Sequence, residues 1–65
     1  MKFRLDIDCD NAAFSDGENN AGREVARILA LASLQISSEY GEAGQSFPLF
    51  DSNGNRVGEA RFEEA

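Results

Sequence analysis

The chain contains no histidine, only one cysteine, Cys9, and only one proline, Pro48. Without histidine, no imidazole can activate the Cys9 thiol as a nucleophile. A single cysteine cannot build an internal disulfide framework. The sequence also lacks a Walker loop, a GxGxxG loop and any cluster of cysteine and histidine. These absences predict a protein that is not an enzyme and that holds neither a metal nor a cofactor.

Positive charge is also scarce: the chain has 12 acidic and 6 basic residues, which give a formal net charge of −6. Binding to DNA phosphates or to an anionic membrane surface needs a basic footprint. No stretch is long and apolar enough to span a membrane or to resemble a signal peptide. We therefore expect a cytoplasmic protein without direct nucleic-acid or membrane binding. Its acidity can serve solubility alone, bind cations, or bind a basic surface on another protein.

The stretch Asn20–Tyr40 predicts the one long helix of the chain. Apolar residues recur along it at helical spacing, so one side would pack on other elements. Asn19 or Asn20 would cap its first turn, and Gly41 would end it in the left-handed conformation. The side expected to face inward consists of Ala21, Val25, Ile28, Leu29, Ala32 and Ile36, with Tyr40 at its margin.

Three short strands are expected. Lys2–Asp8 alternates apolar and charged residues, which is typical of a half-buried strand. Phe47–Phe50 predicts a strand at the edge of a sheet, because Pro48 has no backbone N–H to donate. The sequence DSNGN that follows predicts a tight turn, which leads into a third strand over Arg56–Phe62.

The order strand, helix, strand, strand predicts a single α+β domain over residues 1–65. A three-stranded antiparallel sheet in the order 1-3-2, with the helix on one face, avoids a parallel strand pair. Val57, Ala60 and Phe62 can share one face only if a bulge at or near Gly58 interrupts the third strand. Phe14 would cover one end of the core. The expected core is Phe3, Leu5, Ile7, Val25, Ile28, Leu29, Ala32, Ile36, Phe47, Leu49, Val57, Ala60 and Phe62.

Two aspartate-containing stretches could suit calcium, but neither predicts a metal site. The first begins DIDCDN at Asp6, and its sixth and twelfth positions are Asn11 and Gly17 rather than the Gly and Glu of a calcium loop. The second, DSNGN at residues 51–55, is better explained as a turn.

The acidic residues nevertheless form a pattern. Asp6, Asp8 and Asp10 alternate, and on a strand their carboxylates would lie about 6.5 Å apart. This spacing is similar to that of neighbouring phosphates along a nucleic-acid backbone, so such a row can compete with DNA for a basic groove. The carboxylates predicted to bind a partner are Asp6, Asp8, Asp10, Asp16, Glu18, Asp51 and Glu59.

Two motifs carry a resemblance to a known family. FRLDIDCDNAAF (Phe3–Phe14) and DSNGNRVGEARF (Asp51–Phe62) resemble a family of very short proteins of bacteriophages and other mobile elements. That family includes an anti-CRISPR protein directed against a type I-C system. The resemblance implies a non-enzymatic inhibitor in the cytoplasm of a host bacterium. Its partner would be the basic DNA-binding surface of a type I CRISPR effector, at the subunit that recognises the PAM duplex.

A second hypothesis rests on Leu31 and Leu34, which lie outside the predicted inner face of the helix. With Ala30 they form a smaller apolar stripe. Exposed leucines are common on helices, but this stripe can also contact a partner. The chain would then be a structural or regulatory module that acts as a homodimer or an adaptor. A monomer is expected, with the homodimer as the alternative.

Overall fold

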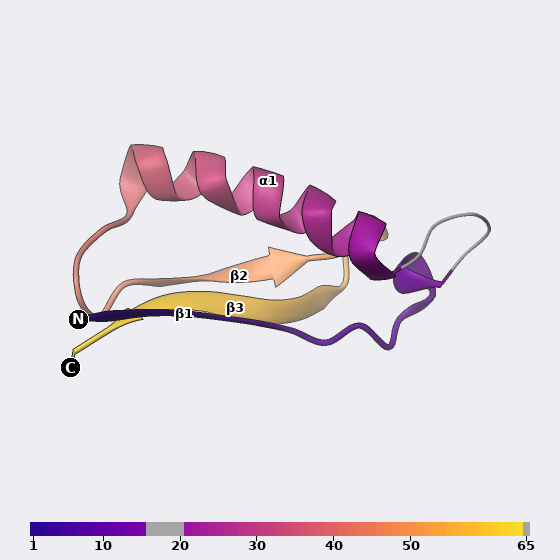
Figure 1. Cartoon of the computed structure of the whole chain (residues 1–65), viewed down its shortest axis with the longest axis horizontal. Helices are drawn as coiled ribbons and strands as arrows, with labels where there is room; N and C mark the ends of the chain where they lie inside the picture. Colours follow the sequence, from indigo (N-terminus) through magenta and orange to yellow (C-terminus); the bar gives the residue numbers. More distant parts are fainter. Residues whose placement is uncertain (16–20, 65) are drawn as a thin grey trace.

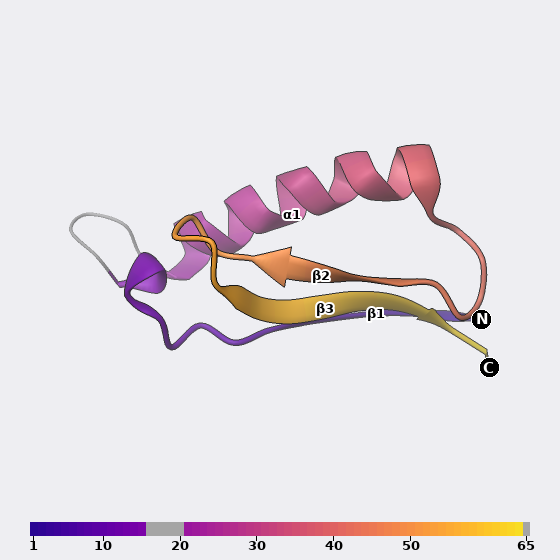
Figure 2. The same ribbon diagram turned by 180° about the vertical axis from the view of Figure 1, so that it is seen from behind.

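The structure is a computed structural model that describes residues 1–15 and 21–64. It consists of β1 (Lys2–Ile7), the short 3-10 helix η1 (Ala12–Phe14), α1 (Ala21–Glu39), β2 (Ser46–Phe50) and β3 (Arg56–Glu63). Figure 1 shows α1 lying along the three strands, and Figure 2 shows the same arrangement from behind. The expected capping residues Asn19 and Asn20 lie outside the described residues.

The three strands form one sheet in the order β1-β3-β2, with both neighbouring pairs antiparallel. The predicted α+β class, strand order and topology are therefore confirmed. β2 is an edge strand, as Pro48 predicted. The two views show β2 running between α1 and the other two strands (Figures 1 and 2).

A bulge in β3 reconciles the two faces of that strand, as the sequence predicted. Leu49 pairs with Gly58 while the next residue, Phe50, pairs with Arg56, so Val57 has no partner on β2. The extra residue turns the Val57 side chain into the core, where only 6% of it is exposed. Gly58 is required beside the bulge because a Cβ there would overlap the backbone carbonyl oxygen of Asp6.

The core lies between α1, β2 and β3 and is closed at one end by η1. Phe14 is buried there, as predicted, and Leu5, Ile7, Val25, Ile36 and Tyr40 pack around the buried residues. The buried apolar residues are Ala13, Phe14, Ile28, Ala32, Phe47, Leu49, Val57 and Ala60.

Two residues assigned to the core are on the surface. Phe3 is 46% exposed and Leu29 is 44% exposed, and the start of the predicted inner helix face, Ala21, is exposed as well. The reason is the position of the helix, which packs nearest β2 and leaves β1 partly uncovered. The ring of Phe3 instead rests on Phe62, with 4.9 Å between the ring centroids.

The end of the helix also differs from the prediction. α1 ends at Glu39, and Gly41 does not adopt a positive φ; among the glycines that the structure describes, Gly44 (92°) and Gly54 (85°) do. The side-chain Oε1 of Gln45 accepts hydrogen bonds from the backbone N–H groups of Gly41 and Glu42, each at 2.8 Å. These two bonds hold the segment that follows the helix, where the backbone N–H groups of residues 41 and 42 share one side-chain acceptor.

Candidate functional site

The row of Asp6, Asp8 and Asp10 does not keep the spacing of a strand. Asp6 lies in β1, directly opposite Glu59 of β3. Asp8 follows the strand and still donates its backbone N–H to the carbonyl of Val57 at 2.7 Å. The chain then turns, because the backbone N–H of Asp10 donates to Oδ1 of Asp8 at 3.2 Å. The expected row of three equally spaced carboxylates is therefore wrong, although all three side chains are exposed.

The turn brings the carboxylates of Asp8 and Asp10 together. A hydrogen bond to Asp8 that the protonated Asp10 carboxyl can make, and then the repulsion between the two charges, raise the pKa of Asp10 above its ordinary value. Among the described residues, no ion pair joins Asp6, Asp8 or Asp10 to a basic side chain. We call these three residues the acidic cluster. A cation arriving from outside would relieve the repulsion within it.

Glu59, predicted to bind a partner, already forms ion pairs within the sheet. It lies on the sheet face that points away from α1 and forms ion pairs with Arg56 at 3.5 Å and Arg61 at 3.4 Å. Glu63, on the same face, pairs with Arg4 at 3.2 Å and with Arg61 at 3.0 Å. Such exposed pairs contribute little to stability, but they neutralise one another. This face is therefore mixed in charge rather than acidic.

Asp51 is also removed from the predicted partner surface, because it is 4% exposed and its carboxylate is fully used inside the fold. Oδ1 accepts the backbone N–H groups of Asn53 and Asn55, each at 2.9 Å. Oδ2 accepts the side-chain amides of Asn11 at 3.1 Å and Asn55 at 3.4 Å. Burial alone would raise the pKa of Asp51, but the hydrogen bonds from Asn55, Asn11 and Asn53 outweigh it and lower the pKa.

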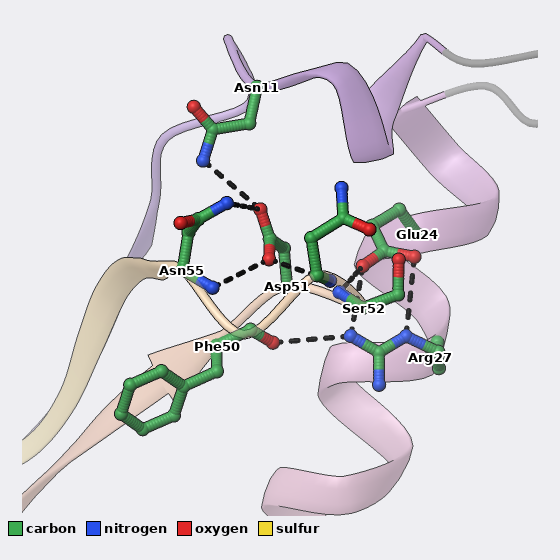
Figure 3. Close-up of polar contacts among 8 residues, drawn as sticks. Asn11, Glu24, Arg27, Phe50, Asp51, Ser52 and Asn55 are labelled. Atoms are coloured by element: carbon green, nitrogen blue, oxygen red, sulfur yellow. Dashed lines mark hydrogen bonds and ion pairs between the residues drawn. The ribbon is translucent and has the colours of Figure 1, made fainter.

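A second buried carboxylate, Glu24, joins the helix to the same turn (Figure 3). Its Oε1 and Oε2 accept Nε and Nη2 of Arg27 at 3.2 and 2.9 Å, and Oε2 also accepts the backbone N–H of Ser52 at 2.8 Å. Arg27 in turn donates to the carbonyl of Phe50 at 3.2 Å. The bond to Arg27 is the main reason that the pKa of Glu24 is lowered, with burial acting against it. Sequence reasoning missed this role, although the i, i+3 spacing of Glu24 and Arg27 was a signal for an ion pair.

The two leucines of the second hypothesis are exposed, as expected: Leu31 by 52% and Leu34 by 67%. Leu31 lines an apolar groove between α1 and β2, whereas Leu34 lies outside it. Phe50, which is 49% exposed, forms part of the opposite wall. The lining residues are Ile28, Leu31, Ala32, Gln35, Pro48, Leu49 and Phe50.

Three further observations limit what the described residues can form. Asp16 and Glu18, predicted to extend the acidic row, lie outside the described residues. Within residues 1–15 and 21–64, no three acidic, cysteine or histidine side chains come together as metal ligands. In the same part of the chain, no helix has the length and apolar character to cross a membrane.

Comparisons of the chain with protein-family models, with curated proteins and with solved structures find no match.

Proposed function

We propose that this protein is a non-enzymatic inhibitor that binds a basic surface on another protein through the acidic cluster of Asp6, Asp8 and Asp10. The observation that carries the proposal is the crowding of Asp8 and Asp10, which raises the pKa of Asp10. Two carboxylates held together, with no ion pair to a basic side chain in the described part of the chain, favour a lysine or arginine from a partner. The other carboxylates predicted for this surface and described by the structure, Asp51 and Glu59, are engaged inside the chain.

The proposed target is the basic, DNA-reading surface of a type I CRISPR effector in the cytoplasm of a host bacterium. The motifs Phe3–Phe14 and Asp51–Phe62 support this choice through their resemblance to the anti-CRISPR family. The acidic cluster belongs to the first motif. The second motif contains the turn held by Asp51 and the bulge beside Gly58. The motifs thus combine an exposed acidic segment with the elements that hold its strand in the sheet.

The form of the acidic surface shapes the mechanism. A strand with evenly spaced carboxylates would imitate one phosphate strand over its length. The observed cluster is instead one carboxylate on β1 followed by a close pair beyond the strand. It matches a small group of basic side chains rather than a long groove. Inhibition would then follow from occupying the few basic residues that contact the PAM duplex, because DNA and the inhibitor would need the same charges.

A direct experiment measures binding to a purified type I-C effector, with and without target DNA, at several salt concentrations. The double variant Asp8→Lys, Asp10→Lys should weaken binding by about tenfold or more, since two favourable charge contacts become repulsive. The matched control, Glu39→Lys with Glu42→Lys, makes the same change of net charge at the end of α1. If both variants bind alike, or if effector, DNA and protein form a ternary complex without competition, the proposal is wrong.

The exposed groove supports a second candidate, an adaptor that binds an apolar segment of another protein. Leu31 and Phe50 are both about half exposed on its walls, and large exposed apolar residues rimmed by polar ones are typical of contact surfaces. The double variant Leu31→Ser, Leu34→Ser should abolish the biological effect if the groove is the site. It should leave effector binding unchanged if the acidic cluster is the site.

A further inference from the structure

The two edges of the sheet are protected unequally. At β2, Pro48 has no N–H to donate, the carbonyl of Phe50 accepts a hydrogen bond from Arg27, and α1 lies alongside the strand. β1 has no proline or glycine and pairs with β3 in an unbroken register from Lys2 to Ile7. Within the described residues, β1 is the other outer strand of the sheet and is paired with β3 alone. A straight, unprotected edge of this kind is a template for another strand.

The register of β1 decides which backbone groups are available. Asp8 donates its N–H to Val57 directly opposite, so in the alternating antiparallel ladder the even-numbered residues of β1 bond to β3. The N–H and C=O groups of Phe3, Leu5 and Ile7 therefore point away from the sheet. Within residues 1–15 and 21–64, the Cys9 thiol donates a long hydrogen bond of 3.9 Å to the carbonyl of Ile7.

The side chains of this edge are self-complementary in charge. Along the face away from α1, the first half of the strand carries Lys2 and Arg4, and the second half carries Asp6 and Asp8. An antiparallel copy centred on Leu5 would place Lys2 opposite the second copy's Asp8, and Arg4 opposite its Asp6. These fall at the positions without mutual backbone bonds, where opposing side chains are closest. Shifting the register by two residues in either direction would instead place Arg4 or Asp6 opposite its own copy.

The apolar face of β1 agrees with the same register. Phe3 would oppose Ile7 of the second copy and Leu5 would oppose Leu5, all on the side of the sheet that carries α1. Phe3 is 46% exposed, while Leu5 and Ile7 are only partly buried. Leu29 is 44% exposed. It lies about 200° around the helix from Leu31, so it is on the side of α1 that faces away from the groove between α1 and β2. A two-fold axis through Leu5 keeps both helices on one face and brings these sides toward each other.

We propose that the chain forms a homodimer by antiparallel pairing of β1 with β1 of a second copy, centred on Leu5, which gives one continuous six-stranded sheet. This interface differs from the Leu31 and Leu34 stripe of the helix. It uses Asp6 and Asp8, so self-association and the effector contact proposed above exclude each other. The monomer is the form that would bind the effector.

A charge-swap experiment tests the pairing by light scattering and sedimentation. The wild-type chain should be dimeric at a concentration of about 1 mM and dissociate on dilution. Lys2→Glu with Arg4→Glu, and separately Asp6→Lys with Asp8→Lys, should each weaken self-association by about tenfold or more, because like charges then face each other. Mixing the two variants should restore a dimer. A monomeric wild type, unchanged self-association in both variants, or a mixture that stays monomeric would overturn the proposal.

Hydrogen exchange separates this interface from one on the helix. The amides of Phe3, Leu5 and Ile7 should exchange about tenfold more slowly at high than at low protein concentration, because the second strand occupies them. The amides of Arg4 and Asp6, bonded to β3 in every state, serve as the control. Equal exchange of the three edge amides at all concentrations would overturn the pairing. The Lys2→Glu, Arg4→Glu variant keeps the acidic cluster, so its effector binding reports on the proposed function independently of the dimer.

Discussion

Oε2 of Glu24 lies 2.8 Å from the backbone N–H of Ser52, and through this bond α1 is joined to the turn between β2 and β3. The two residues are 28 positions apart in the chain. The same oxygen lies 2.9 Å from Nη2 of Arg27, which holds the carboxylate in place. The turn receives a second set of bonds from Asp51, so two buried carboxylates fix the same loop from opposite sides (Figure 3).

Glu24→Gln should destabilise the fold. The amide keeps the size of the side chain but loses the charge that attracts Arg27, and one of its two ends can no longer accept. We expect the melting temperature, measured by circular dichroism, to fall by roughly 5 °C or more. The control is Glu39→Gln, an exposed residue at the other end of α1, which should shift it by less than about 1 °C. Equal shifts in the two variants would contradict the assigned role.

Asp51→Asn should also destabilise the fold, since the four donors around Asp51 need both of its carboxylate oxygens. An amide offers one oxygen and turns its NH2 group toward other donors. The drop in melting temperature should be at least as large as that of Glu24→Gln. Asn55→Ala, which removes one of the side-chain donors and leaves its backbone bond, should have a smaller effect. The reverse order would show that the side-chain amide, not the carboxylate, holds the turn.

Stability should fall in acid through Glu24 and Asp51. The pKa of each is lowered in the folded state, so each contributes stability that is present above its ordinary pKa, 4.5 for Glu24 and 3.8 for Asp51. That stability is lost as the pH falls through the folded-state values below these. Urea unfolding between pH 7 and pH 2 should show the loss, and the Glu24→Gln and Asp51→Asn variants should flatten it.

Asp10 should act in the opposite direction. Its pKa is raised by Asp8, so ionisation of Asp10 opposes folding and removes stability as the pH rises through its ordinary value of 3.8 and above. Asp10→Asn should therefore leave the stability at pH 7 unchanged or slightly higher, while weakening effector binding. A loss of stability in this variant would show that the carboxylate of Asp10 has a structural role.

Gly58→Ala should destabilise the protein by about 1–3 kcal/mol, because the added Cβ would overlap the backbone carbonyl of Asp6 and force the two strands apart. The control is Gly41→Ala, where a Cβ meets no atom within 4 Å and φ is not positive. That variant should change stability by less than about 0.5 kcal/mol. Chemical denaturation measures both.

Leu29→Ala should cost far less than Ile28→Ala. Ile28 is 2% exposed, and its truncation should destabilise by about 2–5 kcal/mol. Leu29 is 44% exposed, so its truncation in the monomer should cost about 1 kcal/mol or less. Similar losses of stability at the two positions would show that Leu29 is part of the core and that the helix packs closer to β1.

The sequence by itself determined the elements and their order. Alternation in Lys2–Asp8, the helical spacing of Val25, Ile28 and Ala32, and the turn residues at 51–55 each act within a few neighbours, so they can be read from the chain. Pro48 predicted the edge strand and Gly58 predicted the bulge for the same reason. These local signals were enough to give the antiparallel order β1-β3-β2.

Only the tertiary structure decided which charges face the solvent. Asp51 and Glu24 are acidic residues like Asp8, but each is bonded by a donor from a distant part of the chain. Asn11, 40 positions from Asp51, donates to Asp51, and Ser52, 28 positions from Glu24, donates to Glu24. Glu59 forms ion pairs with arginines on the same sheet face. The helix packed over β2, which left Phe3 and Leu29 exposed and made β1 an outer strand of the sheet that the structure describes. The role of a carboxylate depends on the donors that the fold brings to it, and the sequence pattern does not contain those contacts.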